Sequence, residues 1–354
     1  MSGKKVLMAM SGGIDSTMSA ILLLEQGYDL VGVTFRSFDT NAETGCCASD
    51  AVAEAKQVAE SLGFTHLTID VRETFRNTVI KDFTDEYMRG RTPNPCVTCN
   101  KTIKWGALLQ LADKENCDLL ATGHYARIGC ENGRHFIRKA TDTSKDQSYF
   151  LWRLSSDELA RTLFPLGDYT KAEIRQMASD RGYVKLSQKK ESQEICFVPD
   201  NNYRQFLRAS VPDFDNIVTP GNFVDINGKI LGKHKGYPNY TIGQRKGLEI
   251  ALGQPMYVSK IDATANTVTL GTKECLLSDS LTASAQNFTK TDISETPIEV
   301  TARVRYRSQG GIASVWQKDG KIHVKFNEPI DSITAGQSVV FYQNEDLIGG
   351  AIID

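Results

Sequence analysis

Apolar and polar positions along the first third of the chain form short blocks with two periodicities. Runs of consecutive or alternating apolar residues predict buried strands, and apolar residues repeated every three or four positions predict amphipathic helices. The predicted strands are 5–8, 30–35, 67–71 and 118–125, and the predicted helices are 18–25, 51–62 and 75–87. Because strands and helices alternate, we expect the fold class to be α/β, with a doubly wound parallel sheet. Thr170 and Glu173 form a capping-box pattern that predicts one more helix, ending at Gly182.

The pattern changes beyond about residue 205. Helical periodicity fades there, and short alternating segments predict strands, among them 267–270, 300–306 and 322–326. We therefore expect two small β-rich domains after the α/β domain, the last of them barrel-like. The expected domains are 1–204, 205–280 and 281–354.

One predicted strand carries a row of arginines. Arg303, Arg305 and Arg307 alternate along residues 300–307, so they would share one face of the strand. A basic stripe of this kind suits phosphate groups. A solvated strand face without a ligand is the alternative.

A glycine-rich stretch, Ala-Met-Ser-Gly-Gly-Ile-Asp-Ser at 9–16, lies between the first predicted strand and the first predicted helix. Free N–H groups and the helix dipole at such a position favour a phosphate-bearing ligand, and the two glycines let the backbone approach it closely. Its serines add hydroxyl donors, and Asp15 could hold Mg²⁺. The stretch matches neither a Walker A loop nor the G-x-G-x-x-G of dinucleotide binders. An ordinary glycine-rich turn with a serine helix cap is the alternative.

Composition limits the classes of protein that fit. Lys and Arg number 41 against 43 Asp and Glu, a formal net charge of −2, so any nucleic-acid site requires a local basic patch. No apolar run is long enough to span a membrane, and the first residues do not resemble a signal peptide, so we expect a soluble, cytoplasmic protein. The eight cysteines then belong to a reducing compartment and form no disulfide scaffold.

Two cysteines have a spacing that indicates chemistry. Cys96 and Cys99 form a C-x-x-C pair, and Asn100 would cap a helix that begins directly after it. Cys99 would then lie at the positive helix end beside Lys101 and Lys104, which should lower the pKa of its thiol. Half of a zinc site is the alternative, although no second Cys/His pair follows at finger or ribbon spacing.

The remaining cysteines differ in their surroundings. Cys196 stands between Ile195 and Phe197 after a charged segment, a pattern that fits both a core position and a loop. No role is assigned to Cys46 and Cys47, and buried packing positions are expected for Cys117, Cys130 and Cys275.

Seven stretches resemble, in order, the motifs of one family, the tRNA-specific 2-thiouridylases, which thiolate the wobble uridine of certain tRNAs. They are 11–16 (SGGIDS), 92–101 (TPNPCVTCNK), 121–125 (ATGHY), 145–151 (KDQSYFL), 191–197 (ESQEICF), 240–247 (YTIGQRKG) and 305–307 (RYR). The first is shared by ATP pyrophosphatases in general, whereas the cysteine stretches and 240–247 are far more specific. The resemblance implies a catalytic ATP pyrophosphatase-like domain, a central β-rich adaptor domain and a C-terminal β-barrel that contacts tRNA.

The resemblance also implies roles for single residues. Cys99 would be the nucleophile and Cys196 would carry a persulfide. Asn94, Pro95 and Cys96 would meet the target base. ATP would be bound by Ala9, Met10, Ser11, Gly12, Gly13, Ile14, Asp15, Ser16, Phe35 and Gly123, with Phe35 standing where the family usually has Met or Leu. Contacts to tRNA would come from His124, Lys145, Asp146, Gln147, Arg305, Tyr306 and Gln343.

The implied reaction begins with adenylation of the uridine O2 by ATP, assisted by Mg²⁺. A persulfide on Cys196 then transfers sulfur, and a Cys99–Cys196 disulfide forms that a reductant must reopen; in an alternative order Cys99 releases hydrosulfide first. The sulfur would come from a persulfide carrier or a cysteine desulfurase. Some members of the family have Asp where this chain has Cys96, which leaves water or Cys96 as the general base. Cys96, Cys99 and Cys196 together could also hold an Fe–S cluster.

Two other functions compete with this one. A pyrophosphate-loop ATP synthetase or amidotransferase acting on a small molecule would need no Cys196 and no tRNA. A non-catalytic tRNA-binding protein would bind tRNA tightly without releasing pyrophosphate.

Overall fold

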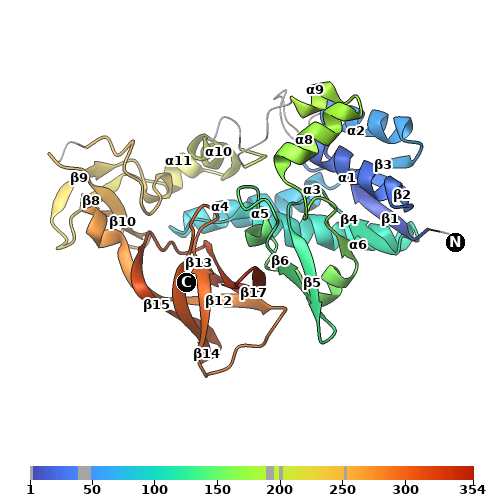
Figure 1. Cartoon of the computed structure of the whole chain (residues 1–354). Coiled ribbons are helices and arrows are strands. Elements are labelled where there is room, and N and C mark those ends of the chain that lie inside the picture. Colours follow the sequence, from blue (N-terminus) through green and yellow to red (C-terminus); the bar gives the residue numbers. More distant parts are fainter. Residues whose placement is uncertain (1–2, 39–48, 189–194, 199–201, 251–252) are drawn as a thin grey trace.

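The amino-terminal part of the computed structural model is built on a five-stranded sheet (Figure 1). The structure describes residues 3–38, 49–188, 195–198, 202–250 and 253–354. The sheet has the order β3-β2-β1-β4-β7 and every pair is parallel. Its strands are β1 Lys5–Ala9, β2 Asp29–Arg36, β3 Thr65–Asp70, β4 Leu119–Ala121 and β7 Thr162–Leu163. The expected α/β fold is confirmed, because all the predicted strands of this region are present and parallel.

Helices cover both faces of this sheet, as side chains of β1 show. Val6 and Met8 pack with helices α1 (Ile14–Glu25) and α2 (Ser49–Ser61), whereas Leu7 packs on the opposite face with helix α6 (Gly106–Lys114). Successive side chains of a strand point to opposite faces, so a continuous apolar run is what a sheet covered on both sides requires.

Two further helical stretches lie between β3 and β4. The first runs through α3 (Arg72–Phe75), the π-helical turn η1 (Arg76–Ile80) and α4 (Lys81–Met88). The second runs from α5 (Pro95–Cys99) through the π-helical turn η2 (Asn100–Trp105) into α6. Later helices are α7 Ser156–Ala160, α8 Lys171–Asp180, α9 Val184–Ser187, α10 Tyr203–Ser210 and α11 Phe214–Ile217. The capping box predicted at the start of α8 is present, with Thr170 and Glu173 bonding each other's backbone.

The central part is a four-stranded sheet of order β10-β11-β8-β9. Its strands are β8 Gly221–Val224, β9 Ile230–His234, β10 Tyr257–Asp262 and β11 Thr267–Gly271. Phe223, Val258 and Leu270 form its buried core together with Tyr240. The predicted β-rich character of this part is confirmed.

The C-terminal part is a closed barrel, because its first strand also pairs with its last. In the order of pairing the strands are β12 Leu277–Phe288, β15 Lys321–Asp331, β14 Gly311–Lys318, β13 Ile298–Arg303, β16 Ser338–Gln343 and β17 Asp346–Ile353. A hairpin from the amino-terminal part, β5 (Arg127–Glu131) and β6 (Arg134–Arg138), also pairs with β17, where Arg138 lies opposite Asp346. The barrel prediction is confirmed, while the hairpin was not foreseen.

The outer face of the barrel packs against the amino-terminal part. Tyr342 and Leu347 share one core with Leu7 and Trp152. The indole N–H of Trp152 donates to Ser338 Oγ at 2.9 Å, and Ser148 Oγ lies 3.0 Å from the Tyr342 hydroxyl. The barrel is therefore fixed to the domain that carries the glycine-rich stretch 9–16.

Three expectations about side chains are corrected. Strand β13 ends at Arg303, so Arg305 and Arg307 lie in the following turn and no arginine stripe forms. Cys130 is exposed on the edge strand β5, and Cys275 is exposed in a short 3₁₀ turn, whereas Cys117 is buried as expected. Apolar neighbours in sequence did not reveal that these two segments lie at the surface. Cys46 and Cys47 lie outside the described residues.

No helix within the described ranges is both long enough and apolar enough to cross a membrane.

Candidate active site

The glycine-rich stretch forms a tight loop between β1 and α1. Gly12 has φ +67°, and a Cβ atom there would lie 2.5 Å from the Ala51 carbonyl oxygen, so only glycine fits. A Cβ on Gly13 would meet only Ser11 Oγ, at 3.5 Å, so the backbone is open on that side. Gly13 occupies the N-cap of α1, where no side chain caps the helix. The serine cap considered as an alternative is therefore not present, and no side chain caps the first N–H groups of α1.

Asp15, in the first turn of α1, is held by two residues from distant parts of the chain. Lys171 Nζ lies 2.7 and 2.8 Å from its two carboxylate oxygens, and the Tyr125 hydroxyl donates to it at 2.8 Å. Lys171 is buried and begins helix α8. The sequence analysis did not predict a role for this lysine. The one feature that could have indicated it is its position directly after Thr170, the N-cap of α8.

Two other residues expected to bind ATP lie at the same edge of the sheet. Gly123 follows β4, and a Cβ on it would lie 3.0 Å from backbone atoms of Asp15 and Ser16. Its lack of a side chain therefore lets the end of β4 contact the glycine-rich stretch 9–16. Phe35, at the end of β2, is partly buried and packs against two of the hydrophobic cores. Carboxyl ends of parallel strands are where ligands bind in such sheets.

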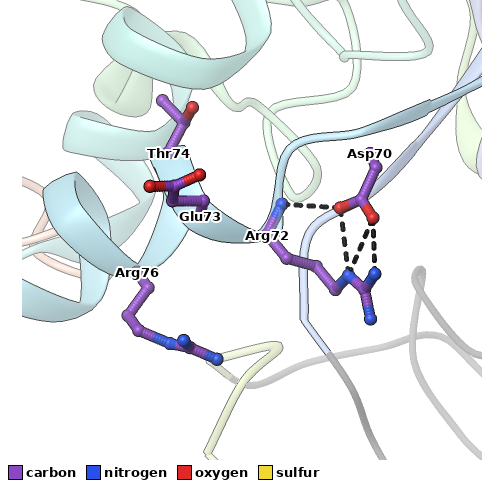
Figure 2. A pocket seen from close by; sticks show the side chains of 5 residues that line it. All are labelled: Asp70, Arg72, Glu73, Thr74 and Arg76. Carbon is purple, nitrogen blue, oxygen red and sulfur yellow. Dashed lines mark hydrogen bonds and ion pairs between the residues drawn. The ribbon is translucent and has the colours of Figure 1, made fainter.

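The carboxyl end of β3 borders a pocket of about 440 Å³, which Figure 2 shows. Its lining residues are Asp70, Arg72, Glu73, Thr74 and Arg76. The Arg72 guanidinium donates to both carboxylate oxygens of Asp70, and this hydrogen bonding lowers the pKa of Asp70 to about 2. The pocket was not foreseen, since charged residues after a strand carry no specific signal.

The cysteine helix begins earlier than expected. Pro95 is its first residue and Asn94 occupies the N-cap, so the predicted start after Asn100 is wrong. Proline suits the first helical position because its fixed φ fits a helix and it has no N–H to satisfy. Asn100 is buried within the helix, where its side-chain amide donates to the Phe150 carbonyl oxygen at 3.0 Å. Cys96 therefore lies in the first helical turn and Cys99 only in the second.

The two lysines near the cysteines have different surroundings. Lys101 forms hydrogen-bonded ion pairs with both oxygens of Glu158 at 2.8 Å, which neutralises its charge. Lys104 Nζ lies 3.3 Å from His124 Nε2. Burial among protein atoms raises the pKa of the Cys96 thiol, and the positive charge of Lys104 offsets part of this rise. The Cys96 side chain itself is reached by solvent. Lys104 is thus the cation that acts on the first-turn cysteine.

His124 is a neutral imidazole held in one orientation. Because the Lys104 ammonium can only donate, His124 Nε2 accepts, and Nδ1 carries the proton toward Thr122 Oγ1 at 2.8 Å. Burial and then the Lys104 charge hold the pKa of His124 well below its ordinary value of 6.5. The ring also contacts Trp105, with centroids 5.7 Å apart.

The pKa of His124 predicts a pH dependence of stability. The folded state binds fewer protons than the unfolded state below pH 6.5, so the free energy of unfolding should fall as pH drops from about 6.5 toward the folded pKa. His124→Gln should flatten this slope by up to about 1.4 kcal/mol per pH unit. Urea unfolding at pH 7.5, 6.5 and 5.5 measures it, with His135→Gln on strand β6 for comparison. Equal slopes in wild type and His124→Gln would refute the prediction.

One aromatic cluster connects Cys99 with the residues on both sides of Cys196. Cys99 and Ile195 pack against this cluster, and Phe197 belongs to it. The Phe197 ring meets Phe83 edge to face, with centroids 5.3 Å apart. Cys196 is an exposed thiol next to this buried anchor, so it is a surface residue and not a core one. Phe35, at the end of β2, packs against the same cluster.

The turn after β13 carries two of the expected tRNA contacts. Arg305 donates to the Ile242 carbonyl oxygen at 3.1 Å and to Thr334 Oγ1 at 2.7 Å. The Tyr306 ring lies on Phe150, with centroids 4.4 Å apart. Arg303 supports the turn from inside by donating to the carbonyl oxygens of Tyr306 and Ser308.

The other expected tRNA contacts differ in exposure. Asp146 is buried, accepts hydrogen bonds from Ser148 and from the Ala140 N–H, and lies 3.5 Å from Arg303 Nη1. Gln147 is tied to Tyr125, whose N–H donates to its side-chain oxygen at 2.9 Å. Gln343, in contrast, is exposed at the end of β16, and Lys145 is half-buried. The inward bonds of Asp146 and Gln147 indicate that they shape the backbone of this segment.

No three His, Cys, Asp or Glu side chains in the described part of the chain are gathered so that they could hold a metal ion. Cys96, Cys99 and Cys196 all belong to that part, so they do not form the ligand set of an Fe–S cluster in this arrangement.

Comparison with known proteins places these features in a family. Three family models match consecutive parts of the chain: a "tRNA methyl transferase HUP domain" at 4–200, a "tRNA methyl transferase PRC-barrel domain" at 206–272 and an "Aminomethyltransferase beta-barrel domain" at 278–353. A protein of Amoebophilus asiaticus named tRNA-specific 2-thiouridylase MnmA is 49% identical over 357 residues, which cover 99% of this chain and 95% of its own length. Proteins of the same name from Cytophaga hutchinsonii and Salinibacter ruber are each 46% identical, and the matches cover 99% of this chain and 97% and 94% of those proteins. These full-length matches confirm the resemblance that the seven motifs indicated. The chain therefore belongs to the family of the tRNA-specific 2-thiouridylases.

Proposed function

We propose that this protein is a tRNA-uridine 2-sulfurtransferase, which uses ATP to replace the O2 of the wobble uridine with sulfur. The observation that supports the proposal is that Phe35, at the end of β2 next to β1 and its glycine-rich loop, packs against the same aromatic cluster as Cys99. The neighbours of Cys196 contact that cluster as well. An enzyme that activates an oxygen with ATP and then displaces it with sulfur needs the loop and the cysteines together.

Activation of the base falls to the glycine-rich stretch 9–16, which acts as the phosphate loop. The uracil C2 carbonyl is a poor electrophile, so its oxygen attacks the α-phosphorus of ATP, forms the O-adenylate and releases pyrophosphate. The free N–H groups at the start of α1 and the open backbone at Gly13 suit the charge that develops on the phosphates. Asn94, Pro95 and Cys96, at the start of the cysteine helix, are the residues that would meet the base.

Sulfur transfer falls to the two cysteines. The terminal sulfur of a Cys196 persulfide attacks C2 of the adenylated base, and AMP leaves with its oxygen. The Cys99 thiolate then attacks the inner sulfur of Cys196, which frees 2-thiouridine and leaves a Cys99–Cys196 disulfide. A two-electron reductant reopens the disulfide, and a persulfide carrier or cysteine desulfurase reloads Cys196. In the alternative order, Cys99 first releases hydrosulfide from the persulfide, and the hydrosulfide attacks C2.

The sequence suggested Mg²⁺ and an Fe–S cluster as metal groups, and only Mg²⁺ fits the side chains that would hold it. Mg²⁺ would neutralise the phosphate charge of ATP, and Asp15 has the hard oxygen ligands that it prefers. Both oxygens of Asp15 contact Lys171 here, so bound Mg²⁺ would share that carboxylate with the lysine. An Fe–S cluster does not fit the arrangement of the three cysteines, and the proposed steps do not use one.

Contacts to tRNA are proposed for seven residues: His124, Lys145, Asp146, Gln147, Arg305, Tyr306 and Gln343. Tyr306 offers a ring, and Gln343 is exposed on the same barrel. A folded RNA is recognised mainly by its shape and its backbone, which suits contacts spread over the barrel and the adjoining domain. The base must also leave its stack to reach the cysteine helix.

Formation of 2-thiouridine tests the proposal directly. Purified protein receives ATP, Mg²⁺, a persulfide source and unmodified tRNA, and nucleosides are then identified by mass. We expect 2-thiouridine at the wobble position and none without ATP, with a tRNA that has cytidine at that position as the matched control. Cleavage of ATP against a small molecule without tRNA would favour the synthetase alternative. Tight tRNA binding without pyrophosphate release would favour the non-catalytic one.

A further inference from the structure

One turn of the barrel, residues 334–337, is hydrogen-bonded to Thr92 and Pro93, which lead into the helix of Cys96 and Cys99. The side-chain amide of Gln337 donates to the carbonyl oxygens of both Thr92 and Pro93, each at 2.9 Å. The Thr92 N–H donates in turn to the Ala335 carbonyl oxygen at 2.9 Å. These three hydrogen bonds join residues more than 240 positions apart in the chain.

The contact is too close for a side chain at its centre. Gly336 has φ +88°, and a Cβ atom there would lie 2.9 Å from the Thr92 carbonyl oxygen. Next to this contact, Arg91 Nη2 donates to the carbonyl oxygen of Ile353 at 3.1 Å. Arg91 is therefore joined to the barrel by its side chain, and Thr92 and Pro93 by their backbone.

The segment 91–93 leads directly into the helix that carries Cys96 and Cys99. Asn94 and Pro95 follow Pro93 directly and set the start of this helix. The direction in which the chain enters this helix determines where both thiols lie relative to a tRNA that is bound on the barrel. Displacements of about 1 Å at reacting groups can cost about 100-fold in rate.

The same turn also contacts the residue expected to bind tRNA. Arg305 donates to Thr334 Oγ1, and its other bond, to the Ile242 carbonyl oxygen, reaches the central part of the chain. Residues 334–337 thus contact Arg305 on one side and Thr92 and Pro93 on the other.

We propose that Gln337 is a positioning residue for sulfur transfer: by donating to the Thr92 and Pro93 carbonyls, it holds the cysteine helix in register with the barrel that binds tRNA. This inference rests on the proposed function, because sulfur transfer is the step that it serves. It assigns the barrel a second task besides binding RNA, which is to fix the position of the cysteines.

Two substitutions distinguish the effect of the hydrogen bonds that Gln337 donates from the effect of its side-chain volume. Gln337→Glu keeps the shape but presents acceptors to two carbonyl oxygens, whereas Gln337→Lys changes the shape but keeps a nitrogen that can donate to both. Gln317→Glu and Gln317→Lys, on strand β14 of the same barrel, are the matched controls. Gln317 makes no side-chain hydrogen bond to another described residue.

Steady-state thiolation with varied tRNA and varied ATP is the main measurement. For Gln337→Glu we expect kcat to fall about 10- to 100-fold, with both KM values within about twofold of wild type. Gln337→Lys should keep kcat within about threefold, and the controls should match wild type. The alkylation rates of Cys96 and Cys99, read by peptide mass, should change in Gln337→Glu and not in Gln337→Lys.

Three results would overturn the inference. The first is a Gln337→Glu variant with wild-type kcat and alkylation rates. The second is equal impairment of Gln337→Lys and Gln337→Glu, which would point to side-chain volume. The third is a loss confined to KM for tRNA, which would make Gln337 a binding residue. If wild type itself forms no 2-thiouridine, the proposed function fails, and the alkylation rates alone decide whether Gln337 positions the cysteine helix.

Discussion

Cys196→Ser is expected to abolish 2-thiouridine formation while tRNA-dependent release of pyrophosphate continues. Serine cannot carry a persulfide, so the attacking sulfur is lost, whereas the phosphate loop that adenylates the base is untouched. Removing a nucleophile costs a factor on the order of 10⁴ or more in turnover. The thiolation assay and a pyrophosphate assay on the same sample measure the two steps separately.

The structure offers a matched control for this prediction. Cys275 is another exposed cysteine, located between the central sheet and the barrel, and Cys275→Ser should leave both steps unchanged. Cys99→Ser should also form adenylate but fail to complete the transfer. Wild-type thiolation by Cys196→Ser would exclude the persulfide role, and loss of pyrophosphate release together with thiolation would place Cys196 in the activation step.

Asp15→Asn is expected to lower the free energy of unfolding by about 3 kcal/mol, because it removes the negative charge of the carboxylate that contacts the buried Lys171 ammonium. The Lys171 side chain is 8% exposed, whereas that of Asp15 is 34% exposed. Lys171→Met leaves only the better-solvated carboxylate unpaired, so its cost should be nearer about 1 kcal/mol. Chemical denaturation of the full chain measures both values.

The double variant Asp15→Asn/Lys171→Met distinguishes an ion pair from two independent contacts. Coupled residues deviate from additivity by about 0.5–3 kcal/mol, so the double variant should be more stable than the sum of the single costs implies. The pair Arg181–Glu25, on the exposed side of the same two helices, is the control, and its cycle should give a coupling below about 1 kcal/mol. Strict additivity at Asp15 and Lys171 would contradict the prediction.

The sequence by itself determined the features that depend on a short stretch of chain. Apolar periodicity identified β1, β2, β3 and the helices between them, because burial on a sheet or helix face repeats over two or about 3.6 residues. The capping box at Thr170 and Glu173 and the glycine loop at Gly12 were also readable, since both are local backbone chemistry. Seven motifs were enough to indicate the family.

Only the tertiary structure decided which distant residues complete the site. Lys171 meets Asp15 across 156 positions, and Gln337 meets Thr92 across 245. No periodicity extends over such separations, because these contacts follow from how the sheet, helix α8 and the barrel pack together. The start of the cysteine helix at Pro95 was misjudged for the same reason, because the Asn100 amide donates to the distant Phe150 carbonyl oxygen, and this bond outweighs its local preference for a cap. The arginine stripe was misjudged because strand β13 ends at Arg303, whose guanidinium donates to carbonyl oxygens of the turn that follows.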